Sequence, residues 1–392
     1  MKHMQRTADA VIIGGGIMGA ACGPFLARAG VGSVVLRERR TLAAVSTGHS
    51  AANVRCSYSN KVTVELALRA MDMFENDREE LGGPTGFRRT GQLILYGPEH
   101  VEIGRQVLAN EDRFGTGTRE IPVDDVAEIA PQLSTHGIAI ACHQPRAGYA
   151  DPVRTTRTLV EAAEPFGLIA HEGVGARGIT TAGGRVTGVE TDQGRIDTPL
   201  VVNAAGPWGS HVGSTSGLAY SIRWSRESDL VMELPAGFGA LPIVADPICH
   251  IYFRPHGDDG LLVGLDYPKE LEPLDIDDYD AGLDDGTRQR IETGLFRRLP
   301  QLRGARLVKG WASIYTITDD WHPVVGAEPE LAGYYACFGG SGHGFKLGAP
   351  IGESLAAEIT GGTPRVDLSA LRPTRFADGE PITSAWGSGN RA

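Results

Sequence analysis

A glycine-rich turn between two apolar segments constrains the fold of this 392-residue chain more than any other feature. Residues 11–13 are Val-Ile-Ile, which predicts a buried parallel strand. Residues 14–19 read Gly-Gly-Gly-Ile-Met-Gly, a G-x-G-x-x-G, and a helix-compatible run follows as far as Ala29. A second apolar segment at residues 34–36 is followed by Glu38. This order of strand, turn, helix, strand and acid predicts a βαβ unit that binds a dinucleotide.

Each glycine of the turn has its own expected role. Gly14 allows the tight turn, Gly16 lets a pyrophosphate approach the backbone, and Gly19 lets the helix pack on the strand. The helix N-terminus offers amide donors and partial positive charge to a pyrophosphate, and the Glu38 carboxylate suits a ribose diol. Because the chain has 53 glycines, the pattern by itself also fits an ordinary βαβ unit with a glycine-rich turn.

Length, charge and cysteine content limit the class of protein. The length suffices for two domains. The net charge of −11 argues against nucleic acid as a partner, although a small anionic substrate stays possible because local fields need not follow net charge. The five cysteines are widely spaced without a C-x-x-C or a zinc pattern, so we expect free, mostly buried thiols and no metal site. The first apolar run is too short for a signal peptide or a transmembrane segment, and we expect a cytoplasmic protein.

Apolar periodicity outlines the rest of the chain. Strand-like segments dominate residues 220–265, which predicts an antiparallel sheet inserted into the α/β frame. Residues 377–392 are rich in Gly and Ser, and we expect them to be frayed. One apolar stripe predicts a helix over residues 61–81 and consists of Val64, Ala67, Leu68, Met71 and Phe74. The other expected elements are strands at residues 92–96, 138–142 and 200–206, and helices after Asp151-Pro152, at residues 288–299 and at residues 350–359.

Four further segments make the pattern specific. They read STGHSAANVRCSY (residues 46–58), VVNAAGPWG (201–209), KGWASIYT within residues 309–326, and FGGSGHGFKLGAPIGE (338–353). Together with the glycine-rich turn they resemble the D-amino-acid oxidase (DAO) superfamily of FAD enzymes, and within it the monomeric sarcosine oxidases and glycine-oxidase-like amine oxidoreductases. The resemblance covers residues 9–365, and GHGFK is its most diagnostic part.

The resemblance implies an α/β (α+β) fold. An interrupted Rossmann-like FAD-binding domain of the glutathione-reductase type would carry an inserted antiparallel-sheet substrate domain that roofs the flavin. The FAD-binding domain would comprise residues 1–85, 145–215 and 325–392, and the substrate domain residues 86–144 and 216–324.

The resemblance also implies the residues that contact the cofactor. The small side chains of residues 43–53 would let the backbone approach a flat ligand, although a plain surface loop fits them equally. The N-terminus of the last long helix would face the flavin and favour negative charge on the reduced ring. The implied FAD-binding residues are Gly14, Gly16, Ile17, Met18, Gly19, Glu38, Arg39, Ser46, Thr47, Ala204, Gly206, Trp208, Gly342, His343, Gly344, Phe345 and Lys346.

The implied substrate-binding residues are led by Arg55 and Lys346. An arginine fork and a lysine point charge suit a buried carboxylate, although a surface salt bridge would also explain Arg55. His250 and Tyr252 are expected, with Arg254, to alternate on one face of a strand that looks either at the ligand or at solvent. Tyr252 and Tyr315 match substrate-site tyrosines of the sarcosine oxidase pattern.

Two departures from that pattern concern the flavin. Ser313 stands where covalently linked sarcosine oxidases have the attached cysteine, so we expect non-covalent FAD. His49 lies near, but about one residue out of register with, a flavin-linked histidine of dimethylglycine dehydrogenases. Leu262 stands where the family has a lysine that activates oxygen, and Asp266 stands where it has a nearby histidine. Lys269, a few residues later, could supply the missing positive charge.

The leading hypothesis is an FAD-dependent oxidoreductase that oxidises the C–N bond of a small amino acid. The substrate would be a secondary, N-methylated, cyclic or D-amino acid. Hydride would pass to flavin N5, and the imine would hydrolyse. O2 or another acceptor would take the electrons, and a homo-oligomer or a partner subunit stays possible. The alternatives are a dehydrogenase or heteromeric oxidase subunit, and a non-catalytic flavin-binding assembly factor.

Overall fold

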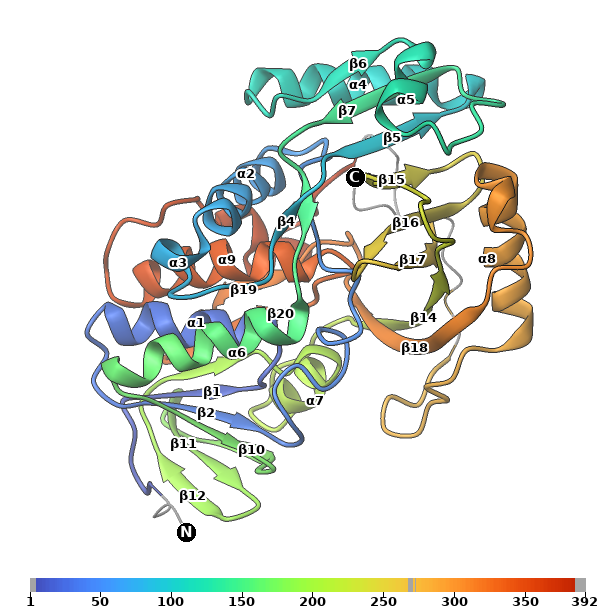
Figure 1. Ribbon diagram of the computed structural model, residues 1–392. Coiled ribbons are helices and arrows are strands. Elements are labelled where there is room, and N and C mark those ends of the chain that lie inside the picture. Colours follow the sequence, from blue (N-terminus) through green and yellow to red (C-terminus); the bar gives the residue numbers. More distant parts are fainter. Residues whose placement is uncertain (1–4, 267–270, 272, 385–392) are drawn as a thin grey trace.

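The computed structural model describes residues 5–266, 271 and 273–384 (Figure 1). Its central sheet is six-stranded, in the order β19-β20-β13-β1-β2-β9. All neighbouring pairs are parallel except β19 with β20. Its strands are β1 (Ala10–Ile13), β2 (Val34–Glu38), β9 (Leu168–Glu172), β13 (Val201–Asn203), β19 (Val324–Ala327) and β20 (Tyr334–Phe338). This arrangement confirms the predicted βαβ unit and the predicted return strand at residues 200–206.

Helices cover one face of this sheet and a small antiparallel sheet covers the other (Figure 1). Alternate residues of β1 serve the two sides, because Ile12 packs toward the helices and Val11 toward the small sheet. The helices are α1 (Ile17–Arg28), α6 (Pro152–Ala163) and α9 (Gly344–Ile359), and α2 (Lys61–Glu75) packs on α9. The small sheet consists of β10 (Ala176–Ala182), β11 (Arg185–Thr191) and β12 (Gly194–Asp197), which sequence reasoning missed although Gly183-Gly184 marks its first turn.

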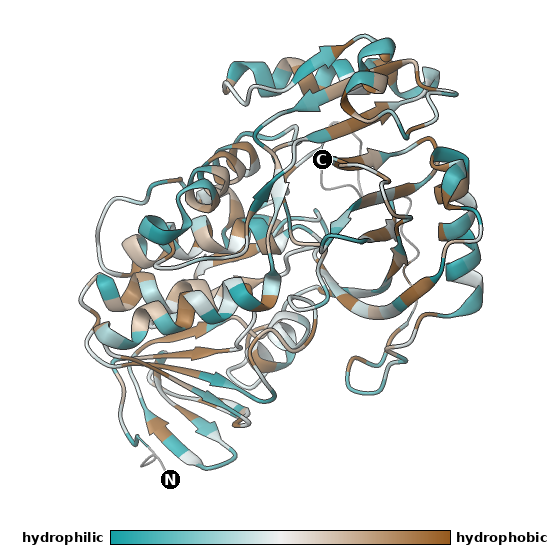
Figure 2. Ribbon diagram, in the orientation of Figure 1, coloured by the Kyte–Doolittle hydropathy of each residue, from teal (hydrophilic) through white to brown (hydrophobic). Residues whose placement is uncertain are grey.

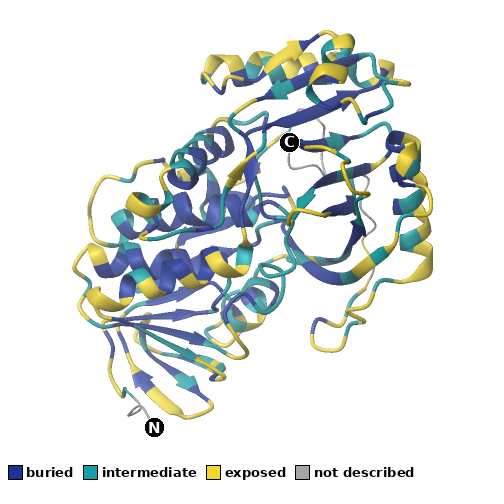
Figure 3. Ribbon diagram, viewed as in Figure 1, coloured by how far each residue is buried: buried dark blue, intermediate teal, exposed yellow. Residues whose placement is uncertain are grey.

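The second large sheet has eight strands in the order β18-β14-β17-β16-β15-β5-β7-β6. Helix α8 (Asp285–Arg298) covers one of its faces, and the two form a separate apolar core. Most strands of both large sheets are apolar and buried in Figures 2 and 3, whereas the edge strand β6 is largely polar and exposed. The strands are β5 (Gln92–Tyr96), β6 (Arg119–Ile121), β7 (Ile140–Gln144), β14 (Arg223–Glu233), β15 (Ile243–Asp246), β16 (Ile251–His256), β17 (Gly260–Leu265) and β18 (Leu307–Ile317).

Shorter elements complete the chain. A three-stranded sheet in the order β3-β8-β4 joins segments from three parts of the sequence. The mixed α/β fold, with a Rossmann-like sheet and an inserted antiparallel sheet, matches the prediction, whereas the domain boundaries stay a prediction. The remaining elements are β3 (Asn53–Val54), β4 (Arg88–Arg89), β8 (Gly148–Tyr149), α3 (Asp77–Glu80), α4 (Val101–Arg113), α5 (Val123–Ile129) and α7 (Gly209–Ser214).

The last helix begins six residues earlier than its predicted start at Pro350, because α9 starts at Gly344. Proline is favoured in the first turn, but here it lies inside the helix. Close packing on α1 explains this, since a Cβ on Gly348 would meet Ile17 at 3.0 Å and a Cβ on Gly352 would meet Ala21 at 2.7 Å. Tertiary packing therefore outweighs the local cost of proline and glycine.

Three further observations bear on the sequence-based expectations. All five cysteines are free and buried, as predicted. Within the part of the chain that the structure describes, no helix is both long and apolar enough to span a membrane. Among the same residues, no group of three or more His, Cys, Asp or Glu is placed to hold a metal ion. Lys269 and the C-terminal part of the segment expected to be frayed lie outside the described residues.

Candidate cofactor and substrate site

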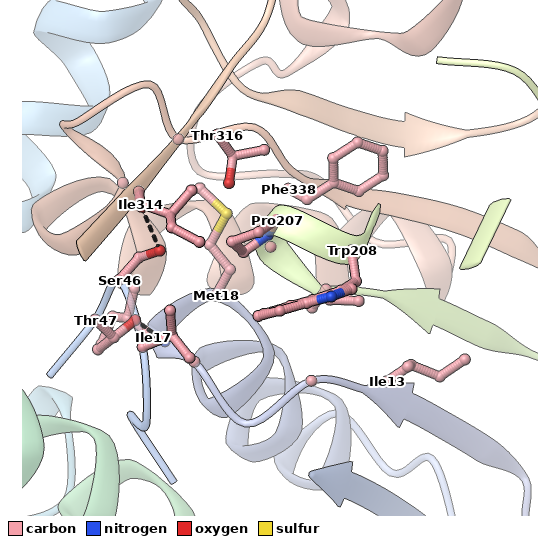
Figure 4. A pocket seen from close by; sticks show the side chains of 18 of the residues that line it. Ile13, Ile17, Met18, Ser46, Thr47, Pro207, Trp208, Ile314, Thr316 and Phe338 are labelled. Atoms are coloured by element: carbon pink, nitrogen blue, oxygen red, sulfur yellow. Dashed lines mark hydrogen bonds between the residues drawn. The ribbon is translucent and has the colours of Figure 1, made fainter. Parts of the chain in front are cut away.

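A cavity of about 430 Å³ lies beside the first turn of α1, and we call it the first cavity. Its walls come from the β1–α1 turn, residues 43–50, the segment after β13, strand β18 and the turn before α9. Figure 4 shows Met18, Trp208 and Thr316 reaching this space from three different segments. The volume falls within the range of ligand and cofactor pockets.

The β1–α1 turn has the close packing that its glycines predict. Gly14 has a φ of +110°, and a Cβ there would come within 2.3 Å of the Ala204 carbonyl oxygen. A Cβ on Gly19 would come within 2.0 Å of the Gly14 carbonyl oxygen. Gly19 therefore allows the helix to pack on the turn, whereas Gly14, Gly16, Ile17 and Met18 line the first cavity.

The N-terminus of α1 presents an anion-compatible surface. Its N-cap, Gly16, has no side-chain cap, and its first turn contains no acid. The amide of Ile17 donates a hydrogen bond to Thr47 Oγ1 at 3.0 Å, and the amide of Gly15 donates to Glu38 Oε2 at 2.7 Å. Because the helix dipole adds partial positive charge, a phosphate group suits this end of the cavity.

A three-residue cluster closes one end of the first cavity. The Arg39 guanidinium lies 3.8 Å from the centre of the Trp208 ring. Asp277 pairs with Arg39 at 2.8 Å and accepts a hydrogen bond from Trp208 Nε1 at 3.0 Å. The hydrogen bond from Arg39 lowers the pKa of Asp277. Asp277 was missed from the sequence, because it lies in an irregular segment before α8 that carries no recognisable motif.

Residues 43–50 and the segment after β13 form the side walls. Ser46 Oγ donates to the Ile314 carbonyl oxygen at 2.6 Å, which ties this segment to β18 (Figure 4). Ser46 and Thr47 line the first cavity from one side, and Ala204 and Gly206 line it from the other. The small-residue segment is therefore a cavity wall and not a plain surface loop.

The residues of the GHGFK segment lie in two different places, some at the first cavity and some beside Tyr58. Gly342, Gly344 and Phe345 line the first cavity. The His343 ring instead contacts Tyr58, with ring centres 5.5 Å apart, and its Nε2 lies 3.1 Å from the Trp321 carbonyl oxygen. Lys346 is buried and donates from Nζ to Tyr58 Oη at 3.1 Å.

Arg55 and Lys346 meet at Tyr58. The Arg55 guanidinium lies 5.0 Å from the centre of the Tyr58 ring, and Lys346 Nζ lies 5.7 Å from the same centre. Arg55 Nη1 also donates to the Ser57 carbonyl oxygen at 3.2 Å. The fold thus brings two cations from opposite ends of the chain to one buried aromatic ring, next to the helix end that lines the first cavity. Two cations so placed can bind one carboxylate.

Glu111 lies within the electrostatic reach of Arg55 and was missed from the sequence. It lies on α4, is 1% exposed, and accepts a hydrogen bond from Thr116 Oγ1 at 3.4 Å. Burial raises the pKa of its carboxyl to about 7, although Thr118 and Arg55 favour the ionised form. Its other oxygen, Oε1, has no hydrogen-bond partner within the described residues. Its burial could have been predicted from its spacing, because Gly104, Val107 and Glu111 form the buried stripe of α4.

The predicted tyrosines lie on two strands of the same sheet, β16 and β18, and the predicted histidine does not join them. Tyr252 on β16 donates to Asp229 Oδ1 at 2.6 Å, and burial with this acid raises the pKa of Tyr252. Tyr315 on β18 lines the first cavity. The prediction that His250 alternates with Tyr252 along the strand is wrong, because His250 is exposed in the preceding turn with a φ of +55°.

Comparison with known proteins identifies the family. The family model described as DAO, FAD dependent oxidoreductase, matches residues 9–358. This chain belongs to that family. The match confirms the resemblance found in the sequence motifs.

Similar proteins include enzymes and a regulatory subunit. Sarcosine dehydrogenase of Mus musculus, a mitochondrial protein, is 30% identical over 391 residues, which cover 96% of this chain and 42% of that protein. The mitochondrial pyruvate dehydrogenase phosphatase regulatory subunit of Mus musculus is 27% identical over 390 residues, covering 94% and 43%. The structure of L-proline dehydrogenase from P. horikoshii superimposes with a TM-score of 0.90 at 26% identity, covering 97% of this chain and 100% of that one. The chain spans less than half the length of these two mouse proteins.

The first cavity fits the FAD that the DAO family implies. The N-terminus of α1, where Gly16 contributes no capping side chain, directs the positive end of its dipole at a pyrophosphate, and a Cβ on Gly16 would fill space only 3.1 Å from Thr47 Oγ1. Ser313 lies on β18 directly before the cavity-lining Ile314, and its hydroxyl is buried. His49 turns its Nδ1 toward the Val45 carbonyl oxygen at 2.8 Å.

The position expected for an oxygen-activating lysine lies on β17. Leu262 is buried there and pairs across the sheet with Arg254 of β16. Asp266 follows the strand, and its amide donates to the His250 carbonyl oxygen at 2.9 Å. A cation therefore does lie beside Leu262, namely Arg254, and only the fold reveals this pairing across the sheet.

Proposed function

We propose that this chain oxidises the C–N bond of a small amino acid, with FAD bound in the first cavity. The observation that supports this most directly is the pair of cations, Arg55 and Lys346, at the Tyr58 ring. A secondary, N-methylated, cyclic or D-amino acid carries one carboxylate to satisfy both cations. The names of relatives such as sarcosine dehydrogenase and L-proline dehydrogenase fit the same substrate class.

Binding and orientation are the work of the chain's own residues. Arg55 supplies a planar fork to the carboxylate, and Lys346, held by the Tyr58 hydroxyl, supplies a second positive charge. The same two cations disfavour a protonated substrate amine, because like charges in a poorly solvated site lower the pKa of the amine. The neutral amine is the form that can be oxidised. FAD, when bound, supplies the acceptor for the hydride.

We propose the following residues for the cofactor. The α1 N-terminus at Gly16 and Ile17 would hold the pyrophosphate, and Glu38 would receive the ribose. Arg39 and Trp208 would close the adenosine end, supported by Asp277. The small residues Gly342 and Gly344 would let the flavin approach the N-terminus of α9. The attachment would be non-covalent, because a serine hydroxyl at Ser313 cannot form a thioether.

The electron acceptor is either O2 or another molecule, namely a second protein or a quinone. The buried Leu262 favours a protein or a quinone over O2. A leucine gives no electrostatic help to the formation of superoxide. A heteromeric assembly or a homo-oligomer is compatible with this proposal, and the cytoplasmic location stays a prediction.

A non-catalytic flavoprotein is the alternative from a different class. The relative named as a phosphatase regulatory subunit motivates it. The intact pair of Arg55 and Lys346 counts against it, because a scaffold has no use for two cations at one buried ring. Reduction of bound FAD by a substrate decides between the two.

The experiment is an anaerobic reduction screen over N-methyl, cyclic and D-amino acids, followed by flavin absorbance. We expect at least one of these classes to bleach the flavin in the wild type and to do so poorly in Arg55→Ala. Arg89→Gln, at an exposed arginine elsewhere on the surface, is the matched control and should behave as wild type. Absence of bleaching with every amino acid would contradict the proposal and support the scaffold.

A further inference from the structure

A second cavity of about 680 Å³ adjoins the first, and Ser50 lines both. Its walls come from residues 48–50, the N-terminus of α6, and strands β8, β16, β17 and β18. Arg55, Lys346 and Tyr58 are not among the residues that line this cavity, so it is not the amino-acid clamp. The residues on which the inference depends are Tyr149, Arg154, Arg254, Leu262, Lys309 and Trp311.

Arg254 is the fixed cation of the second cavity. It is only 4% exposed, and its Nε donates to the Ala51 carbonyl oxygen at 2.7 Å. Its Nη1 donates to the Pro255 carbonyl oxygen at 2.6 Å, and its guanidinium stacks 4.4 Å from the centre of the Tyr149 ring. Nη2 makes no hydrogen bond to the part of the chain that the structure describes. A buried guanidinium with a spare donor can hydrogen-bond an anionic group of a ligand.

Further positive charge surrounds Arg254. Arg88, Arg154 and Lys309 line the same cavity, and of these Arg88 is paired with Asp258 at 3.0 Å. Among the described residues of the lining, Asp151 is the one acid, and it already caps α6 by accepting from the amides of Val153 and Arg154. This local excess of positive charge contrasts with the net charge of −11 for the whole chain.

The pKa of His256 is lowered by burial and by two of the same positive charges. Burial, together with the charges of Arg254 and Lys309, lowers its pKa to about 4. Asp151 and Asp259 act in the opposite direction and are outweighed. His256 is therefore neutral at physiological pH and adds no further charge.

Two aromatic rings and one aliphatic side chain form the apolar part of the wall of the second cavity. Trp311 and Tyr149 contribute rings, and Leu262 contributes a buried aliphatic side chain. Lys309 Nζ lies 5.1 Å from the centre of the Trp311 ring, so one cation stands directly beside an aromatic face. A ligand that satisfies both features combines a planar ring with an anionic group.

We propose that the second cavity binds an aromatic anion, a flat ring bearing a phosphate or a carboxylate. The anionic group lies against Arg254 with Arg154 and Lys309, and the ring lies against Trp311. Because Ser50 lines both cavities, this ligand sits directly beside the first cavity. The proposal does not depend on the amino-acid substrate, because it uses none of the clamp residues.

Isothermal titration calorimetry of the FAD-bound protein tests the proposal, with phenyl phosphate and benzoate as probes and inorganic phosphate for comparison. We expect phenyl phosphate or benzoate to bind more tightly than inorganic phosphate, and the tighter of the two identifies the anionic group. Binding should weaken as NaCl rises from about 50 to 300 mM, because part of the site is exposed. If neither aromatic anion binds, the proposal is wrong.

Variants locate the bound probe. The double change Arg154→Gln and Lys309→Gln alters exposed side chains and should weaken binding about tenfold or more. Arg105→Gln, at an exposed arginine of α4 that lines neither cavity, is the matched control and should leave the affinity unchanged. Trp311→Leu should remove the preference over inorganic phosphate. Binding that survives the double change, or that disappears in Lys346→Met, would place the probe elsewhere and overturn the proposal.

Discussion

Replacing Glu111 by glutamine should change how the stability of the protein depends on pH. Burial raises the pKa of the Glu111 carboxyl to about 7 in the folded state, against an ordinary value of 4.5. Between these two values the folded protein keeps a proton that the unfolded chain has lost. The free energy of unfolding therefore falls as pH rises through this window, and the loss is complete above about pH 7.

The size of the effect follows from the two pKa values. Their difference corresponds to about 3 kcal/mol, with the full penalty present at pH 8 and none below about pH 4.5. Glutamine cannot ionise and keeps an oxygen for the hydrogen bond from Thr116. Glu111→Gln should therefore be more stable than wild type by about 3 kcal/mol at pH 8, and by only about 1 kcal/mol at pH 5.

Urea unfolding of the FAD-bound protein, followed by tryptophan fluorescence from pH 5 to pH 8.5, measures this difference. Glu102→Gln is the matched control, because Glu102 lies on the same helix α4 and is exposed. The control should reproduce the wild-type pH dependence. Parallel pH profiles of wild type and Glu111→Gln would refute the reasoning, since they would mean that Glu111 titrates normally.

The same carboxyl links protonation to substrate binding. The positive charge of Arg55 lowers the pKa of Glu111, and a substrate carboxylate bound to Arg55 would cancel that effect. At about pH 7.5 we therefore expect substrate binding to take up protons, which calorimetry in buffers of different ionisation enthalpy detects. Glu111→Gln should lose this uptake.

Three further predictions concern the clamp and the cofactor. Arg55→Ala should lower kcat/KM by the equivalent of about 2–5 kcal/mol, and Arg55→Lys should recover only part of this loss. Lys346→Met should weaken substrate binding while the FAD content stays normal. Steady-state kinetics and flavin absorbance measure these effects. Acid precipitation should release FAD into the supernatant because Ser313 offers no thiol for attachment, and flavin retained in the pellet would contradict this. Reduced enzyme should reoxidise slowly in air and faster in Leu262→Lys, as stopped-flow absorbance will show; fast reoxidation of the wild type would contradict the role given to this position.

The sequence by itself determined the βαβ unit and the family. These features depend on short-range patterns, because the spacing of Gly14, Gly16 and Gly19 fixes a turn and apolar runs fix the neighbouring strands. The GHGFK segment likewise identified residues at the N-terminus of the last helix, α9, that line the first cavity. The start of that helix was misjudged, because the packing of Gly348 and Gly352 on α1 is invisible in local propensity.

The family resemblance already paired Arg55 with Lys346, but only the tertiary structure showed where they meet and which other side chains lie beside them. Arg55 and Lys346 meet at Tyr58, Glu111 joins them from a helix of the other sheet, and Asp277 reaches Trp208 from an irregular segment. The cations of the second cavity are likewise scattered along the sequence. Burial, the pKa of a carboxyl and the sign of a local field depend on groups that packing brings together, and no window of sequence contains those groups.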